Sequence, residues 1–234
     1  MSNDTGTDLF YIGEMDSADL PAATDLPTPA TDPTGPCAAP SAGGGLVEVG
    51  GRDRAALLNP RPVVLVGSCK DRANFATVAW VTPVSHDPAL VAFALRPASK
   101  TFQDIMDTGC FSINTLDPAL AGAAEFCGLH SGHATDKAAG VAHRLEPHHP
   151  LGEAPGDDET PAALVPFVEG ALSVLDCEVE SVRRTGDHSL VVGFVCRALT
   201  RCPRGDDGTV CATDTLLCVQ RHRYAVASGI CPHV

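Results

Sequence analysis

Short apolar runs rich in β-branched residues recur along the chain from about residue 46. Gly, Pro, Asn and Asp bound these runs, which is typical of β-strands. Within 171–184, three apolar residues alternate with three acidic ones, the pattern of a sheet with one face in water. The pattern predicts a mostly antiparallel set of strands over 62–69, 75–84, 89–96, 110–116, 171–184, 189–200 and 216–226.

Two helices interrupt the predicted strands. Ser99 is suited to cap a helix over 100–108, which Gly109 ends. Asp117 followed by proline begins a second helix that runs to about Cys127. Residues 128–161 show little periodicity and are predicted to form a long loop region, either without regular structure or with a short ordered turn. The fold class is therefore mainly β, a barrel with inserted α-helices.

The first 45 residues differ from the rest of the chain. They hold seven acidic side chains, six prolines and no Lys or Arg, so most of them are predicted to form a flexible extension. The apolar cluster within 8–15 is the exception. It either adds a strand to the fold, docks on a partner, or is an apolar tail with no specific contact. The predicted organisation is an extension over 1–45 and one folded domain over 46–234.

The net charge, the apolar runs and the cysteine spacing limit which partners, location and thiol state we expect. The net charge of −13 disfavours nucleic acid and anionic membranes as partners. No run reaches the roughly 18 apolar residues that span a bilayer, and the N-terminus lacks a secretory signal, so we expect a cytoplasmic protein. The ten cysteines are scattered without a C-x-x-C pair, which predicts free thiols.

The most informative segment is 96–101, where a strand turns into a helix. The first N–H groups of a helix lack intrahelical acceptors and attract anions. Arg96 and Lys100 add positive charge there, and Ser99 and Thr101 add hydroxyl donors, which favours a phosphate site. The alternative is an ordinary capped helix with solvated cations.

A second segment, 72–85, carries small residues along an apolar strand. Small side chains let a flat ring approach the backbone, whose polar groups then contact the edge of the ring. This arrangement suits a flavin. The alternative is an ordinary buried strand.

Six motifs in order resemble the flavin reductase-like, FMN-binding split-barrel family, and most closely its flavoredoxin-type branch. They are NPRPVVLV (59–66), NFATVAWVTPVSHDP (74–88), LRPASKT (95–101), FSINTL (111–116), FCGLHSGHATDK (126–137) and TGDHSLVVGFV (185–195). The chain departs from the family in its acidic extension, its cysteine number and the loop 147–160.

The resemblance implies a homodimeric, Greek-key split β-barrel that binds FMN. It implies that the phosphate lies at Arg96, Ser99, Lys100 and Thr101, and the ring along Asn74, Ala76, Thr77, Val78, Ala79 and Trp80. It further implies that a segment containing His130, Ser131, Gly132 and Lys137 closes over the cofactor.

His188, in the family's Gly-Asp-His motif, is the candidate catalytic residue. It is suited to orient a nicotinamide or to steady charge on the reduced ring. The alternative is a turn residue that begins a strand. There is no G-x-G-x-x-G motif after a strand, so NADH or NADPH must use the flavin site itself.

Histidines cluster between residues 130 and 149, at His130, His133, His143, His148 and His149. No acidic or cysteine partner recurs with them at ligand spacing, so no metal site is predicted.

The function predicted is hydride transfer from NAD(P)H to flavin, with reduced flavin or electrons passed to a monooxygenase or redox-protein partner. One alternative is a flavoredoxin-type electron carrier. A second is a specialised-pathway flavin enzyme on the same barrel that does not oxidise NAD(P)H.

Overall fold

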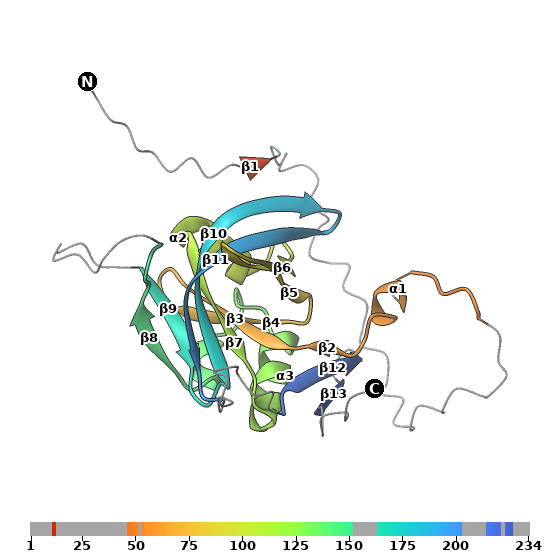
Figure 1. The fold of residues 1–234 in the computed structure, drawn as a ribbon. Helices are drawn as coiled ribbons and strands as arrows, with labels where there is room; N and C mark the ends of the chain where they lie inside the picture. Colours follow the sequence, from red (N-terminus) through yellow and green to blue (C-terminus); the bar gives the residue numbers. More distant parts are fainter. Residues whose placement is uncertain are drawn as a thin grey trace, which may run out of the picture.

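The computed structural model describes residues 11–12, 46–51, 53–151, 163–202, 214–220 and 223–226. Seven strands form the main path of one sheet, in the order β4-β3-β7-β10-β11-β6-β5 (Figure 1). Their bounds are β3 (Val64–Cys69), β4 (Ala73–Val78), β5 (Val81–His86), β6 (Ala89–Leu95), β7 (Cys110–Thr115), β10 (Ser173–Thr185) and β11 (His188–Thr200). All neighbours on this path pair antiparallel where the register is defined, which confirms the predicted mainly β fold.

The two end strands of this path, β4 and β5, are consecutive in the chain. The sequence pattern predicts one strand over 75–84, which is wrong, because the chain leaves β4 after Val78 and re-enters the sheet at Val81. Between them, the carbonyl of Trp80 accepts a hydrogen bond from the Ala94 N–H at 3.0 Å. The segment Ala79–Trp80 therefore joins the two ends of the curved sheet.

The helices follow their capping signals. Helix α2 spans Lys100–Thr108, as predicted: the Ser99 side chain accepts from the Phe102 N–H, and Gly109 ends the helix at φ 73°. Asp117 caps a short 3-10 helix, η2 (Pro118–Leu120), which continues into α3 (Ala121–Leu129). A one-turn helix, α1 (Asp53–Ala56), precedes the sheet.

The structure contains two smaller sheets, where the sequence pattern predicts a long loop and a single final strand. Within the predicted loop, η3 (Ala138–Gly140) is followed by β8 (His143–Pro147), which pairs with β9 (Leu164–Val168). The predicted strand 216–226 is two antiparallel strands, β12 (Leu216–Gln220) and β13 (Arg223–Val226), and β12 also pairs with β2 (Arg61–Pro62). These pairings depend on partners far away in the sequence, so periodicity does not reveal them.

The extension contributes one described element, β1 (Tyr11–Ile12), which pairs parallel with Val182 and Arg183 of β10. Of the three alternatives for the apolar cluster within 8–15, this pairing is the one in which the cluster adds a strand. The other residues before Leu46 lie outside the described part of the chain. In that part, no helix is long and apolar enough to cross a membrane.

Apolar side chains pack on both faces of β3. Val64 and Val66 belong to a cluster with Phe93, Phe111 and the buried face of α2. Val63 and Leu65 belong to a second cluster, which contains Phe75, Phe167 and residues of α3. Residues of β3 and of β4 therefore pack into both clusters.

In the described part of the chain, five cysteines are free thiols, which agrees with the sequence prediction for them: Cys69, Cys110, Cys127, Cys177 and Cys196. Cys110 and Cys127 are only 1% and 2% exposed. Burial raises the pKa of each to about 11, from an ordinary value of 9.0. A thiol with a raised pKa stabilises the fold below pH 9, and this contribution is lost as pH rises toward 11.

We therefore expect the free energy of unfolding to fall between pH 8 and pH 10, by about 1.4 kcal/mol per thiol at pH 10. Urea unfolding of the wild type and of Cys110→Ala at pH 7.5 and 10 measures this. The variant loses less stability across that interval. An equal loss in both proteins would show that the thiol does not titrate with folding.

Candidate functional site

The predicted phosphate segment lies between β6 and α2. Ser99 has extended backbone angles, and its hydroxyl is 3.2 Å from the Phe102 nitrogen that donates to it. Thr101 is 2% exposed, and its hydroxyl accepts from the side-chain amide of Asn74 at 2.7 Å. This bond connects the helix N-terminus to β4, so two of the predicted segments meet here.

Lys100 does not stand free at the helix N-terminus. Its ammonium donates to both carboxylate oxygens of Asp104, at 2.8 and 3.0 Å. Asp104 is 3% exposed and also accepts from the Ser68 hydroxyl at 3.2 Å. The buried carboxylate therefore neutralises part of the positive charge that the sequence places at this site.

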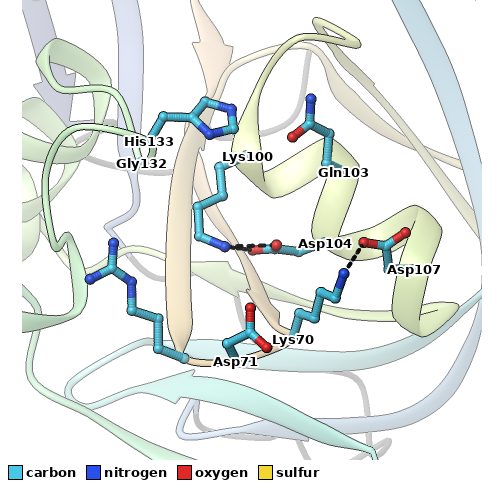
Figure 2. Close-up of a pocket in the computed structure, with 9 residues that line it drawn as sticks. Lys70, Asp71, Lys100, Gln103, Asp104, Asp107, Gly132 and His133 are labelled. Carbon is cyan, nitrogen blue, oxygen red and sulfur yellow. Dashed lines mark hydrogen bonds and ion pairs between the residues drawn. The ribbon is translucent and has the colours of Figure 1, made fainter.

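A polar pocket opens beside this helix (Figure 2). It has a volume of about 320 Å³ and is lined by Lys70, Asp71, Arg72, Lys100, Gln103, Asp104, Asp107, Gly132 and His133. Only Lys100 and Gly132 of these were among the predicted site residues. The other charged side chains come from the turn after β3 and from α2, where sequence patterns indicate only a turn and a capped helix.

The cations of the pocket are paired with carboxylates. Lys70 contacts Asp107 at 2.7 Å, and Figure 2 shows this pair beside the Lys100–Asp104 pair. Arg72 lies 3.6 Å from Asp136, which belongs to the predicted closing segment. The ammonium and guanidinium groups of the pocket are thus already paired with Asp carboxylates. An anion that enters the pocket must compete with those carboxylates.

Gly132 brings the closing segment against the other two. A Cβ atom placed at Gly132 would lie 2.4 Å from Asn74 Oδ1 and 3.2 Å from Lys100 Cβ. Only glycine allows this approach without displacing Asn74, which is buried. Residues 74, 100–101 and 132 therefore form one site, although they are separated widely in the sequence.

The rest of the closing segment splits into two groups. His130 and Ser131 are exposed; the His130 Nδ1 contacts the Phe126 carbonyl at 2.8 Å, and the Ser131 hydroxyl accepts from the His133 N–H. Lys137 points into the protein instead. Its ammonium donates to the carbonyls of Phe75 at 2.9 Å and Cys127 at 2.7 Å, and burial lowers its pKa.

Lys137 therefore connects α3 to β4 through these two carbonyls. The cofactor contact that the resemblance implies for Lys137 stays a prediction. We expect Lys137→Met to lower the free energy of unfolding by about 2–4 kcal/mol, because two buried carbonyls lose their donor. Urea unfolding measures the loss. Lys70→Met, which removes only an exposed ion pair, is the control and should leave the unfolding curve nearly unchanged.

The predicted ring segment has an uneven environment. Val78 is buried, Ala76 and Ala79 are half-buried, and Trp80 is 41% exposed. The Thr77 hydroxyl donates to the Ala124 carbonyl of α3 at 2.5 Å, so this side chain is turned toward the helix. The segment thus runs from the buried part of β4 to the exposed Trp80, and Thr77 anchors it to α3.

His188 lies beside the end of this segment. Its ring centroid is 4.9 Å from that of Trp80, and its Nδ1 is 2.8 Å from Asp187 Oδ1. The hydrogen bond to His188 holds the pKa of Asp187 below its usual value, and the charge of Arg96 adds to the effect. Ser189 pairs with Leu95, and the Ala94 N–H donates to the Trp80 carbonyl, so the backbones of β11 and of residue 80 flank the end of β6 while the two side-chain rings meet.

The predicted residues accordingly gather in two adjoining groups. Asn74, Lys100, Thr101 and Gly132 surround the N-terminus of α2. Trp80, Arg96 and His188 lie around the carboxyl end of β6, which is Leu95, four residues before the N-cap Ser99. A polar site and an aromatic site therefore share the segment that joins β6 to α2.

The family model described as the flavin reductase like domain matches residues 57–227. The chain belongs to this family, and the resemblance found in the sequence is confirmed.

Three curated relatives are about 30% identical. A flavin reductase of Pseudomonas putida is 30% identical over 50% of this chain. The reductase subunit HsaB of a flavin-dependent monooxygenase of Mycobacterium tuberculosis is 33% identical over 48%, and an NADH-dependent flavin reductase of a Rhodococcus species is 30% identical over 57%. The matches cover 59%, 50% and 65% of those proteins, respectively, so the chain spans half to two thirds of their length.

Solved structures share the fold. A crystal structure of an FMN-binding protein from Thermus thermophilus has a TM-score of 0.64 at 23% identity, covering 80% of this chain and 99% of that one. Flavoredoxin from Methanosarcina acetivorans has a TM-score of 0.65 at 19% identity, covering 81% and 95%. At this level of sequence identity, the structural similarity establishes the fold alone. Any statement about chemistry rests on the residues described above.

Proposed function

We propose that this protein is an FMN-binding flavin oxidoreductase that takes hydride from NADH or NADPH. The observation that carries the proposal is the convergence of separated segments, 74–80, 96–101, 132 and 188, at the joint between β6 and α2 in a chain of the flavin reductase-like family. The P. putida and Rhodococcus relatives are flavin reductases by name, which supports the same activity.

The residues present fit an FMN phosphate. Gly132 lets its segment approach Asn74 and Lys100 closely at the N-terminus of a nine-residue helix, and it lines the polar pocket there. Arg96, Ser99, Lys100 and Thr101 would hold the phosphate through charge-assisted and hydroxyl hydrogen bonds. Lys100 would then exchange part of its contact with Asp104 for the phosphate.

The flavin ring would lie along residues 74–80. Ala76 and Ala79 leave room for a flat ring, and Thr77 and Lys137 hold the strand against α3. When bound, FMN supplies the hydride acceptor, so the protein needs no side-chain general base. The task of the protein is to bind, orient and stack the two ring systems.

His188 would place the nicotinamide. If Nδ1–H donates to Asp187, then Nε2 of the neutral imidazole is an acceptor, which suits an amide N–H of the nicotinamide carboxamide. Packing against Trp80 fixes the plane of the imidazole. His188 would therefore orient the nicotinamide without exchanging a proton in the hydride step.

Anaerobic reduction tests the proposed function. Protein loaded with FMN is mixed with NADH or NADPH in a stopped-flow instrument, and flavin absorbance is followed against free FMN at the same concentration. Bleaching much faster than that of free FMN supports the reductase. An FMN-loaded protein that neither nucleotide reduces, although dithionite does, contradicts it and favours the electron carrier or the specialised enzyme.

Three parts of the sequence interpretation stay predictions. They are a homodimer, a cytoplasmic location and transfer of reduced flavin or electrons to a monooxygenase or redox protein. The HsaB relative is by name the reductase subunit of a monooxygenase, which supports such a partner. Sedimentation of the purified chain tests the dimer.

A further inference from the structure

A second cluster of chemically active side chains lies apart from the site above. A ring nitrogen of His148, a carboxylate oxygen of Glu178 and the Cys196 sulfur all lie within 4.8 Å of one another. They come from the segment after β8, from β10 and from β11. Each of the three residues is partly buried.

The histidine of this cluster is held by a buried carboxylate. Asp176 is fully buried, and its Oδ1 lies 2.6 Å from the His148 Nδ1. Its other oxygen accepts from the His149 N–H at 2.9 Å. The alternating pattern of β10 predicts Asp176 on a wet face, which is wrong, because the segment after β8 covers it. With Nδ1 directed at Asp176, Nε2 remains as the ligating nitrogen.

A carboxylate on the far nitrogen of a histidine is the arrangement that protein metal sites use. It fixes the tautomer and the ring orientation and makes the ligating nitrogen more basic. Asp176 thus gives His148 the environment of a metal ligand, independently of the donor atoms that surround it.

A β-bulge directs the cysteine to the same place. Asp176 pairs with Arg197 and Cys177 pairs with Val195, so Cys196 is the extra residue on β11. A bulge locally re-aims a side chain, and bulges are frequent next to functional sites. Here the bulge brings the Cys196 sulfur close to Glu178, the second residue after Asp176 on β10.

We propose that His148, Glu178 and Cys196 bind a zinc ion, with Asp176 as the positioning residue. One imidazole, one carboxylate and one thiolate form a donor set that zinc accepts readily. Tetrahedral zinc spaces such donors roughly 3.3–3.5 Å apart. The three donors lie within 4.8 Å of one another, so reaching this spacing requires the Glu178 side chain to move; its carboxylate accepts a 3.3 Å hydrogen bond from the Leu151 N–H.

Binding has a cost and a structural consequence. Burial, with smaller contributions from Glu178 and Asp176, raises the pKa of the Cys196 thiol to about 11, so zinc must displace its proton. The ion would connect the segment after β8 to β10 and β11. Three protein ligands leave a fourth position for water or an external ligand. The inference does not depend on flavin binding.

Metal titration of the full chain tests the proposal. The protein is stripped with EDTA and titrated with zinc chloride by calorimetry, and with cobalt chloride by difference absorption. We expect one tight zinc per chain and a thiolate-to-cobalt charge-transfer band. Cys196→Ser should abolish the band, and Cys196→Ser and His148→Ala should each weaken zinc at least about tenfold. Asp176→Asn should weaken it about 10- to 100-fold while leaving the band in place at saturation.

His86→Ala, which removes an exposed histidine at the end of β5, is the matched control and should bind zinc like the wild type. The proposal is overturned if the wild type binds no zinc more tightly than His148→Ala does, or if the cobalt band survives in Cys196→Ser. Cys196→Ser is a conservative change at a partly exposed position, so its result decides the case even if Asp176→Asn does not fold.

Discussion

FMN should bind about 10- to 100-fold more weakly to the double variant Lys100→Ala/Asp104→Asn, because a charge-assisted hydrogen bond contributes about 1.5–3 kcal/mol and 1.4 kcal/mol is tenfold in affinity. Riboflavin, which lacks the phosphate, should change by less than about twofold. Fluorescence titration of both flavins gives the two affinities. The comparison isolates the phosphate from the ring.

The second substitution is needed because Lys100 neutralises Asp104. Lys100→Ala alone leaves a carboxylate that is 3% exposed without its cation, which destabilises the fold for a reason unrelated to flavin. Asn at position 104 removes that charge and still accepts from Ser68. Asp104→Asn alone is the matched control: it frees Lys100 and should bind FMN at least as tightly as the wild type. Equal weakening of FMN and riboflavin in the double variant would refute the phosphate assignment.

The parts of the fold that sequence reasoning finds are those set by local interactions. Helix α2 begins and ends at the predicted residues because Ser99 and Gly109 satisfy its ends directly. Asp117 places the start of η2 and α3 by the same mechanism. Single elements of this kind require no knowledge of distant partners.

Sequence reasoning fails where a distant partner decides. The residues of β8 have no strand pattern of their own. They form a strand because β9 pairs with them. The break at Ala79–Trp80 arises because β4 pairs with β3 whereas β5 pairs with β6. The apolar pattern of the sequence continues through Ala79–Trp80, so it does not indicate that the strand breaks there.

The same limit applies to the sites. The family motifs identify Asn74, Lys100 and Gly132, and the structure brings these together. They do not reveal that Lys137 turns inward, since its partners are two backbone carbonyls. Nor does the histidine-rich segment disclose Glu178 and Cys196, because a bulge and a covering segment bring them to His148.

His188→Ala should slow the reduction of bound flavin by NAD(P)H about 10- to 100-fold, equivalent to about 1.4–2.8 kcal/mol of transition-state stabilisation. The physical reason is the loss of the group that orients the nicotinamide beside Trp80. FMN affinity should change little, because Lys100, Thr101 and Gly132 are untouched. Stopped-flow reduction of the FMN-loaded variant measures the rate.

A second variant separates the chemistry of the imidazole from its shape. His188→Phe keeps a ring against Trp80, which lies at 4.9 Å in the wild type, but removes the acceptor nitrogen. If the nitrogen orients the nicotinamide, then Phe is as slow as Ala, and saturation with NAD(P)H does not restore the rate. A Phe variant that reduces flavin at the wild-type rate would show that packing alone matters. An unchanged rate in the Ala variant would make His188 simply the residue that begins β11.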